Sequence, residues 1–224
     1  MFRSARLFQH SVSCGRGSPV AFRSVSTLPN NPHIYVLPSP KGQILSLLPT
    51  DPPTPELVLG TTTAIPPTPA TFTENSGFMR LLQSVLRKHV DFDPTVIASA
   101  GSYASPGGSS IFSARKRRAT AVSPHGSGAG GANTQGGAGG GGVGGYVHVF
   151  DTRKPPSYGR IPDPEDIFGS VVVDGEGNIQ KGGYEECGAY RIVTNEGILG
   201  LSDYLRVKLV EKLKEEERML RAHG

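Results

Sequence analysis

The sequence predicts a small composite α+β domain of short β-hairpins and two amphipathic helices, interrupted by a disordered glycine-rich insertion. Apolar runs separated by turn residues predict the hairpins, and apolar residues at helical spacing predict the helices. Residues 126–145 consist mostly of glycine, which buries little apolar surface and loses much entropy on ordering. We therefore expect a leader at 1–26, domain halves at 30–98 and 146–220, and an insertion at 99–145.

The first half is expected to begin with a hairpin and end with a helix. Strands are predicted at 33–37 and 43–48, with a proline- and glycine-containing turn between them and a short third strand at 56–59. Asn75 and Ser76 supply the capping side chains of a helix that extends to about Val90. The sparse basic face of this helix favours packing on a core over lying on a membrane surface. Its apolar residues recur at helical spacing: Phe78, Leu81, Leu82, Val85 and Leu86.

The second half is expected to open with a strand at 146–150, followed by one helical turn. Asp163 caps this turn, because Pro164 suits its first position and the acidic Glu165 and Asp166 suit its positive end. Gly169 is expected to end the turn.

A hairpin and a final helix complete the second half. Three valines at 171–173 favour a strand, and the Asp174-Gly175 pair predicts a tight turn after it. The second strand of the pair is expected at 189–194. Ser202 should then cap a helix from about 203 to 220. Its apolar stripe, expected to pack on the strands within 171–194, contains Leu205, Leu209, Val210 and Leu213.

Residues 1–26 have the composition of a mitochondrial transit peptide. They contain four arginines, many serines and no acidic residue, and a basic amphipathic segment is typical of import into the matrix. The alternative is a disordered basic tail. Without these four arginines the 23 basic residues become 19, which equals the 19 acidic ones, so the remaining chain is neutral. The net charge of +4 is therefore weak support for nucleic-acid binding.

The sequence predicts no catalytic residue, no metal site and no cofactor. No two histidines have metal-ligand spacing, no G-x-S-x-G motif occurs, and no apolar run reaches the length of a membrane span. Cys187 follows Glu185 and Glu186, whose negative charges disfavour the reactive thiolate.

Two groups of residues are candidates for binding. The apolar stripe of the final helix fades after Leu213, so the last two turns, with Met219 and Leu220, are expected to project into water or to meet a partner. A second candidate partner surface contains Arg160, Asp163, Glu165 and Asp166. The third candidate is a basic cluster, expected to be either a polyanion contact for RNA or anionic lipid, or simply a solubilising patch. Its residues are Arg115, Lys116, Arg117 and Arg118.

Two runs of the second half read H-V-F-D-T-R-K-P-P-S-Y-G-R-I-P-D-P-E-D-I-F-G-S-V and Y-R-I-V-T-N-E-G-I-L-G-L-S. They resemble uncharacterised nuclear-encoded mitochondrial proteins of filamentous fungi. The resemblance covers roughly 146–217 and implies a mitochondrial accessory protein, without assigning any functional residue. The leading hypothesis is a non-enzymatic matrix accessory or assembly factor that binds the respiratory chain or the mitochondrial ribosome. The alternatives are an RNA-binding module that uses the basic cluster at 115–118, and a small enzyme.

Overall fold

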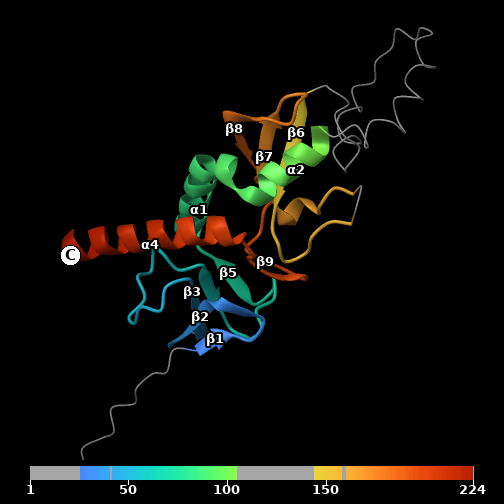
Figure 1. The fold of residues 1–224 in the computed structure, drawn as a ribbon. Helices are drawn as coiled ribbons and strands as arrows, with labels where there is room; N and C mark the ends of the chain where they lie inside the picture. Colours follow the sequence, from blue (N-terminus) through green and yellow to red (C-terminus); the bar gives the residue numbers. More distant parts are fainter. Residues whose placement is uncertain (1–25, 41, 105–143, 158–159, 224) are drawn as a thin grey trace, which may run out of the picture.

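A computed structural model describes residues 26–40, 42–104, 144–157 and 160–223, and within them the fold is α+β (Figure 1). The strands form antiparallel sheets of five, three and two strands, accompanied by the helices α1, α2 and α4. In Figure 1 the five-stranded sheet lies below α4 and the three-stranded sheet lies above it. The transit-peptide prediction falls on 1–26, and of these residues only Ser26 is described.

The five-stranded sheet contains the expected N-terminal hairpin. Its order is β1-β2-β3-β4-β5, and Val36 of β2 pairs with Leu45 of β3. The predicted strand at 56–59 is wrong, because the chain turns there and begins to pair only at Gly60. Leu57 and Leu59 are nevertheless buried in the core. The strands are β1 (Ser26–Leu28), β2 (Asn31–Ser39), β3 (Gly42–Ser46), β4 (Gly60–Thr62) and β5 (Phe72–Glu74).

Helix α1 (Ser76–His89) confirms the first predicted helix, and α2 (Pro94–Ala104) was not predicted. The side chain of Asn75 accepts a hydrogen bond from the Gly77 N–H at 2.9 Å, which caps α1. Its apolar face is buried. The 3₁₀ turn η1 (Val90–Phe92) joins α1 to α2, so residues 99–104 are helical and do not belong to the expected disordered insertion.

Asp93 explains why α2 forms despite its small and polar residues. Its Oδ1 accepts hydrogen bonds from the Thr95 N–H at 2.9 Å and from the Thr95 hydroxyl at 2.8 Å. Val96 and Ala100, one turn apart, then bury the inner face of the helix. The remainder of the expected insertion, 105–143, lies outside the described residues.

The three-stranded sheet confirms the hairpin at Asp174-Gly175 but not its second strand. β6 (Gly145–Phe150), β7 (Ile167–Val173) and β8 (Ile179–Glu186) pair in that order. The turn η3 (Pro164–Asp166) precedes β7 as expected, but the predicted cap is wrong, because the Asp163 side chain accepts no hydrogen bond from the N–H groups of the turn. Gly169 does not end that turn. It lies within β7, where a Cβ would come 2.7 Å from the Tyr184 ring.

The region 189–194 forms less strand than expected. Only β9 (Val193–Thr194) pairs, with β10 (Gly197–Ile198). Tyr190 and Ile192 are buried without joining a ladder, and Val193 is buried as well, so the two sides of this segment do not divide into an inner and an outer face.

Helix α4 (Asp203–His223) begins as predicted, but its main contact is α1 and not the strands within 171–194 on which it was expected to pack (Figure 1). The Ser202 hydroxyl accepts a hydrogen bond from the Leu205 N–H at 3.2 Å, which confirms the cap. Leu205, Leu209 and Leu213 are buried. One hydrophobic core includes residues from both sides of the insertion, from Leu28 to Ala100 and from Val147 to Leu213.

Candidate functional site

The buried guanidinium of Arg153 holds together the loops beside α1. Its side chain is 3% exposed, and its Nε donates to Asp166 Oδ1 at 2.7 Å. A terminal nitrogen lies 3.4 Å from Asp151 Oδ2, and the guanidinium carbon lies 5.4 Å from the centre of the Tyr190 ring. We call these four residues the Arg153 network. The terminal nitrogens also donate to the backbone carbonyls of Glu165, Arg191, Ile192 and Gly197.

Asp151 provides the acceptors of this network. It is fully buried and accepts hydrogen bonds from the Tyr190 hydroxyl at 2.9 Å, the Gly200 N–H at 2.8 Å and the Arg153 N–H at 2.9 Å. Burial raises the pKa of Asp151 to about 6, although the charge of Arg153 acts in the opposite direction. Burial and the neighbouring Asp151 raise the pKa of Tyr190 well above its usual value, so the phenol stays protonated and donates. The network therefore serves to position the loops.

The segment 187–192, which the Arg153 network positions, is also bound to the N-terminal sheet. Glu74, in β5, accepts a hydrogen bond from the Ile192 N–H at 2.8 Å. The rings of Tyr190 and Phe168 lie 4.5 Å apart, which anchors the segment on β7. Residues 187–192 are thus held from both halves of the chain.

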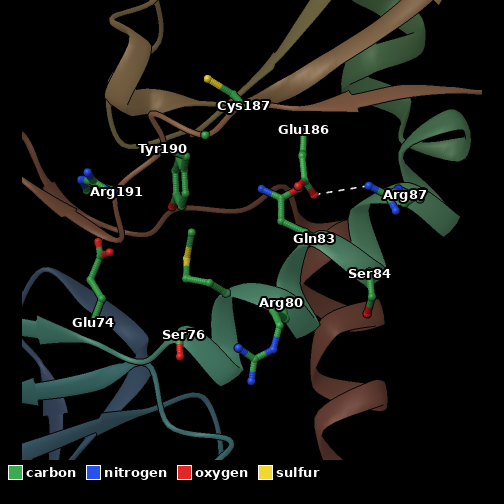
Figure 2. Close-up of a pocket in the computed structure, with 12 residues that line it drawn as sticks. Glu74, Ser76, Arg80, Gln83, Ser84, Arg87, Glu186, Cys187, Tyr190 and Arg191 are labelled. Atoms are coloured by element: carbon green, nitrogen blue, oxygen red, sulfur yellow. Dashed lines mark hydrogen bonds and ion pairs between the residues drawn. The ribbon is translucent and has the colours of Figure 1, made fainter.

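The Arg153 network and α1 together form a groove, which we call the α1 groove (Figure 2). It encloses about 520 Å³ and lies between the outer face of α1 and the segment 186–191. The residues that α1 contributes recur at helical spacing, so they form one continuous wall. The lining residues are Glu74, Ser76, Met79, Arg80, Gln83, Ser84, Arg87, Glu186, Cys187, Gly188, Tyr190 and Arg191.

Three arginines and two glutamates surround the α1 groove, and the glutamates are already engaged. Glu186 forms an exposed ion pair with Arg87 at 3.3 Å, as Figure 2 shows, and Glu74 accepts from the Ile192 N–H. The guanidinium groups of Arg80 and Arg191 are exposed and make no hydrogen bond or ion pair with the described part of the chain. The α1 groove therefore offers two cationic groups that are free to bind.

The wall of the α1 groove is rigid at Gln83. Its amide oxygen accepts from the Tyr184 hydroxyl at 2.8 Å, and its amide nitrogen donates to the Phe168 carbonyl at 3.3 Å. Burial raises the pKa of Tyr184, which keeps this donor protonated. Since both ends of the amide are occupied within the fold, Gln83 shapes the α1 groove and does not serve as its ligand.

Cys187 is a half-buried free thiol at the margin of the same groove. Its sulfur lies 3.8 Å from the Pro164 carbonyl and donates weakly to it. This contact gives the thiol a packing role.

The predicted partner surface at 160–166 is only partly accessible. Asp166 is 2% exposed and bonded to Arg153, so it belongs to the interior, and its inclusion in a binding surface is wrong. Asp163 and Glu165 line a second hollow of about 550 Å³, whose lining also includes Arg191 of the α1 groove. Asp163 is already paired with Lys154 at 3.2 Å. Arg160 is exposed and is not among the residues that line this hollow.

The predicted C-terminal surface is exposed. Helix α4 continues beyond Leu213 away from the sheets (Figure 1), and Met219 and Leu220 are among the exposed large apolar residues. The structure brings neither of them to the α1 groove. The basic cluster Arg115, Lys116, Arg117 and Arg118 lies outside the described residues.

Two general features complete the description of 26–40, 42–104, 144–157 and 160–223. These ranges contain no group of three or more His, Cys, Asp or Glu residues arranged to hold a metal ion. Within the same ranges, no helix combines the length and the apolar character that crossing a membrane requires.

Sequence reasoning missed both the Arg153 network and the α1 groove. Arg153 stands in an Arg-Lys-Pro-Pro run that indicates only the end of a strand, while its side-chain partners other than Asp151 lie 12 to 44 residues away. Arg80 and Arg87 were recognised as part of the polar face of a helix. What faces them comes from residues about 100 positions later, which no local pattern reveals.

Comparison with known proteins found no match, since no family model, no curated protein and no solved structure is similar to this chain.

Proposed function

We propose that this protein is a non-enzymatic accessory or assembly factor that binds another protein through the α1 groove. The observation that carries the proposal is a preformed groove with two free guanidinium groups on its margins. Arginine and methionine are enriched where proteins bind each other, and the groove has Arg80, Arg191 and Met79 in its lining. Because α1 and the Arg153 network fix its walls, binding costs little ordering of the protein itself.

The mitochondrial matrix is the proposed location. The support is the arginine-rich, acid-free composition of residues 1–26. A respiratory-chain complex or the mitochondrial ribosome is the proposed class of partner. The exposed end of α4, with Met219 and Leu220, offers a second contact for a large assembly.

The test compares two tryptophan substitutions in the tagged full-length chain. Ser84 lines the α1 groove, whereas Ser102 is on α2, outside its lining. Both serines are exposed and donate their hydroxyls to a carbonyl of their own helix. Ser84→Trp should fill the α1 groove, and Ser102→Trp should add the same surface elsewhere.

Native gels of gently solubilised mitochondria, probed for the tag, provide the measurement. The wild-type chain and Ser102→Trp should migrate in a complex much larger than the 23.6 kDa chain, and Ser84→Trp should migrate mainly as the free chain. A wild-type chain that migrates alone would contradict the proposal, as would a complex that Ser84→Trp leaves intact. A complex that ribonuclease dissolves would favour RNA binding instead.

A further inference from the structure

We propose that the α1 groove recognises an acidic segment of its partner protein, one that places an apolar side chain between carboxylates. This inference rests on the proposed function and adds the chemistry of the partner. Three features of the α1 groove support it: the charges around the groove, the apolar residues in its lining, and a rim that disfavours nucleic acid.

The charges favour carboxylates. Arg80 comes from α1 and Arg191 from the opposite segment, so the two free guanidinium groups lie at different margins of the α1 groove (Figure 2). A guanidinium binds a carboxylate through two parallel hydrogen bonds. An occupant with two separated carboxylates would therefore satisfy both arginines.

A third carboxylate contact can form by exchange at Arg87. Its ion pair with Glu186 is exposed on both sides, 60% for Arg87 and 56% for Glu186, and such a pair contributes little stability because water and salt compete with it. A carboxylate of the partner can replace Glu186 at small cost. When this pair opens, the guanidinium of Arg87 becomes available to the partner.

The lining also accommodates an apolar side chain. Met79 and Cys187 are both half-buried there. A thioether is flexible and polarizable, so Met79 can adapt to apolar groups of different shape. A volume of about 520 Å³ admits a few side chains of a bound segment.

The same rim disfavours nucleic acid. Glu74 and Glu186 stand among the arginines, and they would repel the uniform negative charge of a phosphate backbone. Single-stranded nucleic acid also binds by stacking its bases on aromatic faces, and Tyr190, at 1% exposure, offers none. The mixed pattern therefore fits a protein segment whose carboxylates are placed opposite the arginines.

The experiment selects short random peptides displayed on phage against the full-length protein and measures the enriched peptides by fluorescence anisotropy. The test variant reverses both free charges, Arg80→Glu with Arg191→Glu. Lys181→Glu is the matched control, because Lys181 is an exposed cation on β8 and is not among the lining residues. Circular dichroism checks that each variant is folded. Arg80→Glu alone, on the exposed face of a helix, is the second variant if the double change unfolds the protein.

The wild type should enrich peptides rich in Asp and Glu. Charge reversal should weaken their binding at least about tenfold, since close charge pairs across interfaces are strongly coupled. Lys181→Glu should leave it unchanged. Raising the salt from about 0.05 to about 0.5 M should weaken binding to the wild type, because it screens these charges.

Peptides without an acidic bias would overturn the inference, and so would binding that survives charge reversal. Tighter binding of poly(U) RNA than of the selected peptides, lost in the same variant, would overturn it in favour of nucleic acid. The proposed function fails separately. If Ser84→Trp dissolves the native complex while peptides show no acidic preference, the α1 groove binds a partner and only its chemistry is wrong.

Discussion

Replacing Arg153 by methionine should destabilise the fold more than any exposed substitution nearby. Methionine keeps much of the volume and the apolar stem but removes every donor. Asp166 then loses its partner at 2.7 Å, and Asp151 loses the guanidinium at 3.4 Å. Four backbone carbonyls also lose one donor each, although those of Glu165 and Ile192 keep a backbone N–H. Two carboxylates are thus left in the interior without a counter-charge.

The magnitude follows from the burial of both partners. Removing one member of a buried ion pair costs about 3–5 kcal/mol, since the remaining charge is neither solvated nor paired. For a chain of this length each kcal/mol lowers the melting temperature by about 2–4 °C, so the expected loss is roughly 6–20 °C. The segment around Arg191, which lines the α1 groove, should loosen first, because Arg153 binds the carbonyl of Arg191.

Thermal melting followed by circular dichroism measures this effect, with Lys154→Met as the control. Lys154 is the next residue, and its pairs with Asp163 and Glu196 are exposed, so its loss should change the melting temperature little. Adding Asp166→Asn to Arg153→Met should restore part of the stability by removing one unpaired charge. The reasoning is refuted if Arg153→Met costs no more than Lys154→Met.

Three further predictions concern the core, the end of α4 and pH. Leu209→Ala should lower the free energy of urea unfolding by about 2–5 kcal/mol, because Leu209 is 0% exposed. Val207→Ala, at a residue that is 51% exposed, should lower it far less. Equal losses in the two variants would contradict the packing of α4. Removing 214–224 should leave the melting temperature nearly unchanged, since most of these residues are exposed; unfolding would show that this end belongs to the core. The pKa of Asp151 is raised from 3.8 to about 6, so its contribution to stability is present at low pH and is lost as pH rises through about 6. Compared with Asp151→Asn, the wild type should therefore gain roughly 1 kcal/mol of unfolding free energy between pH 7 and pH 5. An unchanged difference in urea unfolding at the two pH values would show that Asp151 keeps its usual pKa.

Features determined by a few adjacent residues could be predicted from the sequence. Asn75 and Ser202 cap their helices because the capped N–H groups lie within three residues. The Asp174-Gly175 turn is equally local, since Asp174 accepts from the N–H groups of Glu176 and Asn178. Such contacts depend little on the rest of the fold.

Features determined by distant residues could not be predicted in the same way. The β-branched alternation at 189–194 indicated a strand more strongly than the glycine-containing 179–186, yet the latter forms β8. Propensity is overruled there, because the Arg153 network and Glu74 bind the backbone of 191–192 that a strand would need. The α1 groove depends on the same distant contacts, so the sequence provided its arginines but not their surroundings.

The way α4 completes the core bears on how the protein is made. Helix α1 is synthesised more than a hundred residues before α4, and the leucines that pack beside it end at Leu213. A nascent chain that has reached β8 can cover part of α1, but the side that α4 covers stays exposed until α4 is made. The core therefore closes only when α4 docks, so shorter intermediates of the chain expose apolar surface that the complete fold buries.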